Sequence, residues 1–267
     1  MYENIQDPKK KKQPQKQIEE PEKSQIYTLY INHDSLEENT QLLETALQDL
    51  HNFHQDHPKH LPIFLTINLK SYLKDYNINF PSLLQKIETQ LKTSLSLQNL
   101  FLPKNLLKTH ASLLTAVKND NYPKIQQLLG KFIVLLDPEL FSQEDPNQQE
   151  LLDFYNNYSQ NVENSLMFPT LDGRLILVNF QTFAEFLEQN QVQNQIFFNM
   201  PGDLYESDYY YLQEEAQNII KEAQKQNFIT RVYTINDEEF YEYYKNQKVN
   251  FICTDAVFYN LFAKPFF

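Results

Sequence analysis

Short apolar runs that end in polar residues recur along the chain. The stretch 57–70, HPKHLPIFLTINLK, predicts a strand with one apolar face, while the other face begins with Phe64 and Thr66 and ends with Asn68 and Lys70. Similar runs are LYINHD (29–34), FIVLLD (132–137), LILVN (175–179), IFFN (196–199), VYTIND (232–237) and FICTD (251–255). A strand that becomes polar at its carboxyl end is typical of a β/α barrel, whose interior is packed at one end and opens into a site at the other.

Segments with helical periodicity separate these runs. They are predicted at 42–53 before Pro58, 81–95 after Pro81, 113–118, 124–129, 148–158, 181–190, 212–223 and after Asn236. Gly130 has the character of a helix C′ residue just before the strand at 132–136. Alternating strands and helices predict a parallel sheet, and 267 residues are close to the roughly 250 of one β/α barrel. We therefore expect an α/β fold of the TIM type as a single domain, 26–267, preceded by a disordered polar and basic tail, 1–25, that contains Lys9–Lys12.

Composition excludes several functional classes. Three glycines far apart exclude a Gly-rich phosphate loop, and one cysteine, Cys253, excludes a disulfide framework or a CxxC zinc site. A net charge of -12 and a pI near 5.0 argue against nucleic acid as a partner. No apolar run reaches the roughly 18 residues of a membrane span, and the leader lacks an apolar core, so we expect no transmembrane segment and no signal peptide.

Several segments together resemble the calcium-dependent phosphoinositide phospholipase C family. They are DLHNFHQDHPKHLPIFLTINLK, LFLP, LLGKFIVLLD, NFITRVYTIND and VNFICTDA, and the resemblance runs from about Tyr27 to Asp255. It implies a TIM-type barrel, phosphodiester hydrolysis, a phosphoinositide or other phosphodiester substrate, and Ca²⁺ as cofactor. The HPxHxPI turn at 57–63 and GKFIVLLD at 130–137 carry most of the likeness.

The chain also departs from the pattern of that family. The first family strand, with a catalytic histidine, and the second, with acidic metal ligands, have no counterpart in residues 1–25, so we expect a barrel without its first two strands. Tyr30 stands where the second histidine belongs, and His33 substitutes only if the register slips. Asn68 stands at the position of a metal-binding glutamate, which makes it the candidate metal ligand.

The remaining candidate site residues are cations and carboxylates at strand ends. Lys70 and Arg231 match a lysine and an arginine of the family; we interpret Lys70 as a phosphate contact or a solvated strand end, and Arg231 as the partner of a phosphate or an internal carboxylate. Asp137, Asp237 and Asp255 each follow a strand, with a helix N-cap as the alternative for Asp237. Lys70, Arg231 and His33 are thus the candidate catalytic residues, and Lys70, Arg231 and Asp255 the candidates for substrate binding.

Four histidines occur at intervals of three residues: His51, His54, His57 and His60. Such spacing suggests a metal site, but these residues precede a barrel strand, at the end opposite to the chemistry of this fold. We therefore predict a structural or solvated role, with His60 anchoring the turn.

Three functional hypotheses follow. The first is a phosphoinositide phospholipase C-like phosphodiesterase whose catalysis is impaired by the missing histidines. The second is a non-catalytic barrel that binds a phosphorylated headgroup or a protein partner. The third is a truncated gene product; the chain is expected to be cytoplasmic as written, and secreted if its N-terminus is truncated.

Overall fold

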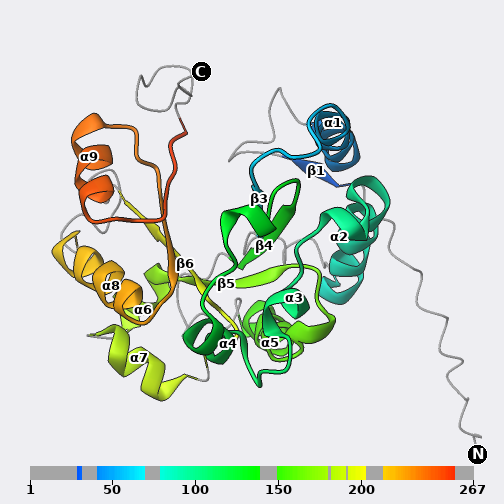
Figure 1. Cartoon of the computed structure of the whole chain (residues 1–267). Coiled ribbons are helices and arrows are strands. Elements are labelled where there is room, and N and C mark those ends of the chain that lie inside the picture. Colours follow the sequence, from blue (N-terminus) through cyan, green and yellow to red (C-terminus); the bar gives the residue numbers. More distant parts are fainter. Residues whose placement is uncertain are drawn as a thin grey trace, which may run out of the picture.

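The computed structural model describes residues 29–31, 41–69, 79–138, 149–179, 182–190, 192–202 and 213–255. Its centre is a six-stranded parallel sheet with the strands in chain order, β3-β4-β5-β6-β7-β8 (Figure 1). The strands are β3 (Ile63–Leu69), β4 (Phe132–Pro138), β5 (Phe168–Asp172), β6 (Phe197–Pro201), β7 (Ile229–Tyr233) and β8 (Phe251–Ile252). Sequential order with every neighbour parallel is the topology of a β/α barrel wall.

Helices flank this sheet, most of them on its outer face. They are α1 (Leu43–Asp56), α2 (Phe80–Leu95), α3 (Pro103–Leu107), α4 (Leu113–Asp120), α5 (Gln149–Gln160), α6 (Gly173–Asn179), α7 (Phe183–Gln189), α8 (Gln213–Lys225) and α9 (Glu238–Asn246). Short 3₁₀ turns are η2 (Leu97–Asn99), η3 (Ile125–Gln127) and η4 (Val162–Asn164). One core joins α1, α2 and α5 to the outer side of β3 and β4, and a second joins α6 to α9 to that of β6 and β7 (Figure 1).

The sheet is curled, so that its two edge strands approach each other at their first residues. The rings of Phe64 on β3 and Phe251 on β8 lie 4.6 Å apart between centroids, and Phe64 also contacts Phe197 on β6. Apolar residues of α3 and α4 pack against the inner face at this end. The described structure is therefore a six-stranded half-barrel with a packed amino-terminal end. It agrees with the expected α/β class, but a complete TIM barrel is not confirmed.

One strand assignment made from sequence is wrong, and another strand lies outside the parallel sheet. The run LILVN at 175–179 belongs to helix α6, and the strand of this unit is β5, which begins at Phe168. A five-residue apolar run does not distinguish a strand from a buried helix, and Pro169 obscured the true strand because proline is rare inside sheets. The predicted strand at 26–31 is described only at β1 (Tyr30–Ile31), which pairs antiparallel with β2 (Gln41–Leu42), outside the half-barrel.

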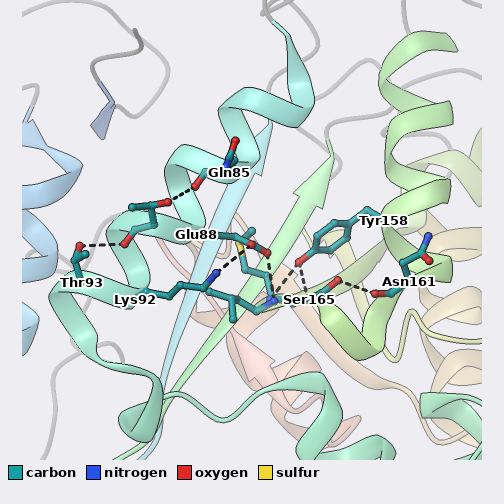
Figure 2. A network of polar contacts seen from close by, with 10 residues as sticks. Gln85, Glu88, Lys92, Thr93, Tyr158, Asn161 and Ser165 are labelled. Atoms are coloured by element: carbon teal, nitrogen blue, oxygen red, sulfur yellow. Dashed lines mark hydrogen bonds and ion pairs between the residues drawn. The ribbon is translucent and has the colours of Figure 1, made fainter. Parts of the chain in front are cut away.

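A polar network fixes the entrance of β5 to helices α2 and α5 (Figure 2). The Tyr158 hydroxyl donates to the Met167 carbonyl at 3.0 Å, and Ser165 donates to the Asn161 carbonyl at 3.3 Å. Glu88 on α2 accepts a hydrogen bond from the Leu166 N–H at 3.4 Å. These contacts satisfy backbone groups just before β5 and so fix the position at which the strand starts. They thereby also fix the positions of the polar residues at its far end.

No helix in the described ranges is long and apolar enough to cross a membrane.

Candidate functional site

Polar side chains occupy the inner face of the half-barrel toward the carboxyl ends of its strands. We call them the interior polar layer: Asp137 on β4, Thr170 and Asp172 on β5, Asn199 on β6, and Arg231 and Tyr233 on β7. In the sheet register the Cα of Asn199 pairs with those of Asp172 and Arg231, and the Cα of Asn68 pairs with that of Asp137. Residues two positions earlier on the same face are apolar, such as Phe197 and Ile229. The predicted change from apolar to polar along the strands is therefore present.

Asp137 is a buried acid of the layer whose pKa is shifted by its surroundings. Its side chain is buried, and one carboxylate oxygen accepts a hydrogen bond from the Thr170 hydroxyl at 2.7 Å. Burial, and secondarily the charge of Asp172, raise the pKa of Asp137 to about 6, although Thr170 and Arg231 favour the ionised form. The carboxyl group is thus able to exchange a proton near neutral pH.

Asp172 is held by Arg174, which lies in the first turn of α6. The Arg174 Nη2 is 2.6 Å from one carboxylate oxygen, and its Nε donates to both oxygens at 3.1 and 3.2 Å. The Arg174 backbone N–H also donates to the carboxylate, at 2.9 Å. A forked pair of this kind fixes the carboxylate and neutralises its charge.

Arg231 and Tyr233 supply the cationic side of the layer. The guanidinium carbon of Arg231 lies 5.2 Å from the centroid of the Tyr233 ring, in a cation–π contact. No carboxylate of the described ranges forms an ion pair with Arg231, which is half-buried. Burial and the nearby Asp172 raise the pKa of Tyr233, so the phenol stays protonated. Of the two partners predicted for Arg231, an internal carboxylate at ion-pair distance is therefore absent among the described residues.

Asn199 lies between the acidic and cationic parts of the layer. Its side chain is 1% exposed, and neither the amide nitrogen nor the amide oxygen has a hydrogen-bond partner. Its sequence signal is the polar end of the IFFN run, but nothing in that run predicted this environment. Asp172 and Thr170 were missed because their strand was not recognised.

The other sequence candidates lie elsewhere or outside the described ranges. Lys70 and His33 fall outside them. Asn68 is exposed on the edge strand β3, and Asp255 is exposed in a bend after β8, where its N–H donates to Asn236. Asp237 is the N-cap of α9 and accepts a hydrogen bond from the Glu239 N–H at 2.7 Å, as the alternative interpretation predicted.

The four clustered histidines lie at the amino-terminal end of β3, away from the polar layer. The His54 Nδ1 is 3.1 Å from the His60 Nε2, and both rings contact Phe132 at the start of β4. The His60 carbonyl accepts a hydrogen bond from the Gly130 N–H at 2.7 Å. Their position fits the predicted structural role, with His60 anchoring the turn.

The described residues do not provide a fitting set of calcium ligands. Calcium takes six to eight oxygen ligands, often from several carboxylates. No group of three metal-ligating side chains occurs in the described part of the chain, and in the layer Asp172 is already held by Arg174. The candidate ligand Asn68 adds one amide oxygen beside Asp137. We therefore derive no step through calcium.

A pocket of about 720 Å³ lies beside β5, between α5 and the segment before β6. It shares Thr170 and Asp172 with the interior polar layer, but most of its remaining lining comes from α5 and from the segment before β6, for example Leu152, Asn156 and Gln193. Since Arg231 and Asn199 are not part of its lining, we place the candidate site in the polar layer.

Fold and site together define an α/β half-barrel with a polar site inside the carboxyl end of its sheet. The chain belongs to the family described as phosphoinositide phospholipase C, Ca²⁺-dependent, whose model matches residues 2–196. No match was found among curated protein sequences.

Solved structures of similar fold agree with this family. A Ca²⁺-dependent phosphatidylinositol-specific phospholipase C from Streptomyces antibioticus is 17% identical with a TM-score of 0.57; the match covers 82% of this chain and 72% of that one. Two structures of a calcium-dependent phosphoinositol-specific phospholipase C from Pseudomonas sp are 18% and 19% identical, with TM-scores of 0.55 and 0.54. Each match covers 79% of this chain, which spans 65% and 66% of the length of those chains. Identities this low support the fold alone.

Proposed function

We propose that this chain binds a phosphorylated headgroup at its interior polar layer, and that it turns over phosphodiesters weakly or not at all. The observation that carries the proposal is the guanidinium of Arg231, which has no ion pair, in a layer that contains no histidine among the described residues. An arginine without an ion pair in a partly buried site favours a phosphate, because the planar guanidinium can donate two parallel hydrogen bonds to its oxygens.

Weak turnover follows from the loss of acid–base groups. A positioned acid or base contributes roughly 10²–10⁴-fold to rate for each proton transfer. By resemblance Tyr30 stands where the family places a catalytic histidine, and a tyrosine, whose reference pKa is near 10, is a poor replacement at neutral pH. Lys70 and Asp255 are retained as proposed phosphate or headgroup contacts, and His33 as the proposed replacement base.

Calorimetry tests the binding part of the proposal. Inorganic phosphate and myo-inositol 1-phosphate are titrated into the full chain, into Arg231→Met, and into Lys245→Met as a matched control. Lys245 is an exposed cation paired with Glu242 on α9 and lies outside the polar layer. We expect the heat to disappear with Arg231→Met and to persist with Lys245→Met, and the affinity of the unmodified chain to fall as salt rises. Equal heats from the unmodified chain and Arg231→Met would remove Arg231 from the site.

Hydrolysis of phosphatidylinositol tests the catalytic part. The purified chain is assayed with calcium and with a chelator, and little or no turnover is expected in either. Robust calcium-dependent turnover that is lost in His33→Ala would contradict impairment and would assign the missing base to His33.

A further inference from the structure

The pocket beside β5 has two walls that are tied together by hydrogen bonds. One wall is helix α5, and the other is the segment 190–195, which leads into β6. The Asn194 amide accepts from the Leu113 N–H at 3.0 Å and donates to the Ser159 carbonyl on α5 at 2.8 Å. The two walls are therefore held in place without a ligand, and binding sites for small molecules are usually formed in advance in this way.

The lining of this pocket is polar but carries almost no charge. Amide side chains come from both walls, among them Asn156 and Gln160 on α5 and Gln193 on the other wall. Asp172 is the only charged residue among the described residues that line the pocket, and it forms an ion pair with Arg174. A charged ligand would therefore lose water without gaining a counter-ion, so the pocket favours an uncharged ligand.

The amides of Asn156, Gln160 and Gln193 are available to such a ligand. None of these three side chains forms a hydrogen bond to another part of the chain within the described ranges, and all three residues are exposed. Each amide offers N–H donors and a carbonyl acceptor. They match a ligand whose groups both donate and accept hydrogen bonds, as hydroxyl and acetamido groups do.

The pocket is also long and partly apolar. Gln149 and Gln160 both line it and are the first and last residues of α5, which places them roughly 16 Å apart along the helix axis. The apolar part of the lining includes Leu152, Leu171 and Leu175. A volume of about 720 Å³ is within the usual range for a ligand site, and this length suits a linear ligand of several units.

We propose that this pocket is a second binding site, separate from the interior polar layer, and that it takes a short neutral oligosaccharide. The hydroxyl groups of a sugar pair with the free amides in both directions, while the apolar faces of the sugar rings pack against the leucines. The proposal does not need a phosphate on Arg231, so it stands or falls independently of the proposed function.

Two neutral trisaccharides test the proposal on the full chain: cellotriose and N,N′,N″-triacetylchitotriose. Saturation-transfer NMR and calorimetry measure their binding. We expect at least one of them to bind, with an affinity that does not change as salt rises, because no charge takes part. Saturating inorganic phosphate should not displace the sugar. No binding of either sugar at millimolar concentration would overturn the proposal, and so would displacement by phosphate, because the sugar would then lie in the interior polar layer.

Substitution of one free amide locates the site. Asn156→Ala should weaken sugar binding about three- to tenfold, because it removes hydrogen bonds to the ligand. Its free energy of unfolding should not fall, because this side chain has no hydrogen bond to lose within the described ranges. Asn157→Ala is the matched control, since Asn157 is the next residue of α5, is also exposed and does not line the pocket. It should keep the affinity of the unmodified chain.

Two further outcomes would contradict the proposal. If Asn156→Ala binds the sugar as tightly as Asn157→Ala does, the sugar does not lie in this pocket. An uncharged peptide, acetyl-tetraglycine amide, is the competing probe, because peptide groups also donate and accept hydrogen bonds. If it binds more tightly than either sugar and loses affinity in Asn156→Ala, the pocket is a peptide site.

Discussion

The electrostatic environment of each acid on the inner face depends on the groups that its side chain contacts. Asp172 has a forked arginine, whereas Asp137 has one hydroxyl and a neighbouring acid. Two acids on adjacent strands therefore experience different environments. At this scale the sequence predicted Asp137 and Arg231 as candidates from their strand-end positions. It could not predict that Arg231 would stack on Tyr233, because that contact depends on side-chain directions in the folded sheet.

The raised pKa of Asp137 predicts a gain in stability when its charge is removed. Its pKa is 3.8 in the reference state and about 6 in the fold, so the folded chain binds more protons between these values and stability falls as pH rises through this window. Asp137→Asn, which can still accept from Thr170, should be more stable than the unmodified chain by on the order of 2 kcal/mol at pH 7. The difference should vanish below pH 4 in urea denaturation; a variant that is less stable at pH 7 would contradict the assignment.

The histidine pair predicts the opposite dependence on pH. Burial, and then the charge of His60, lower the pKa of His54 below 6.5. The unfolded chain therefore binds the extra proton first, and this contribution to stability is present above pH 6.5 and is lost as pH falls. As the pH is lowered from 7.5 to 5.5, the free energy of unfolding of His54→Gln should fall less than that of the unmodified chain.

The histidine cluster is also expected to play no part in phosphate binding. The double variant His51→Gln, His54→Gln should therefore leave phosphate binding intact; loss of that binding would contradict a structural role.

Local sequence signals defined most elements of the structure. Pro81 marked the start of α2, Asp237 caps α9 through its side chain, and helical periodicity located α1 and α8 within a few residues. The alternation in β3 gave the correct division into inner and outer faces. The error at 175–179 arose where periodicity carries no information, because the side chains described in α6 and β5 are nearly all buried.

Gly130 connects two elements through a conformation that a side chain resists. Its φ is 71°, and an added Cβ would lie 2.2 Å from the Pro58 carbonyl oxygen. Gly130→Ala should therefore destabilise the chain by more than the roughly 1–2 kcal/mol of the left-handed conformation alone. Lys248→Gly is the matched control: this exposed residue has φ 59°, so glycine should relieve strain and raise stability. Thermal unfolding measures both, and an unchanged midpoint for Gly130→Ala would refute the clash.

The whole molecule is a sheet whose two edges meet through side chains at one end. Assembly of the polar layer depends on this curvature, which brings β4, β5, β6 and β7 around one interior. Sequence predicted polar strand ends and a parallel sheet, and hence a shared site. It could not predict that Asn199 would lie between Asp172 and Arg231, because the register between strands that are distant along the chain is set by packing.

The contact between the edges predicts a measurable contribution to stability. Phe251 is half-buried, so Phe251→Ala should cost about 1–3 kcal/mol, less than the 3–5 kcal/mol of a fully buried phenylalanine. Leu97→Ala, at an exposed leucine, is the control and should change little. A free energy of unfolding equal to that of the unmodified chain in Phe251→Ala would show that the edges do not support each other.

The contact between Phe64 and Phe251 can form only late in the synthesis of the chain on the ribosome. The strand that carries Phe251 is the last of the six to be synthesised, so β3 to β7 emerge while the ring of Phe64 has no partner on the far edge. A nascent chain that pauses before β8 therefore leaves the ring of Phe64 without its partner from the far edge, and the two edges meet only when the final strand arrives.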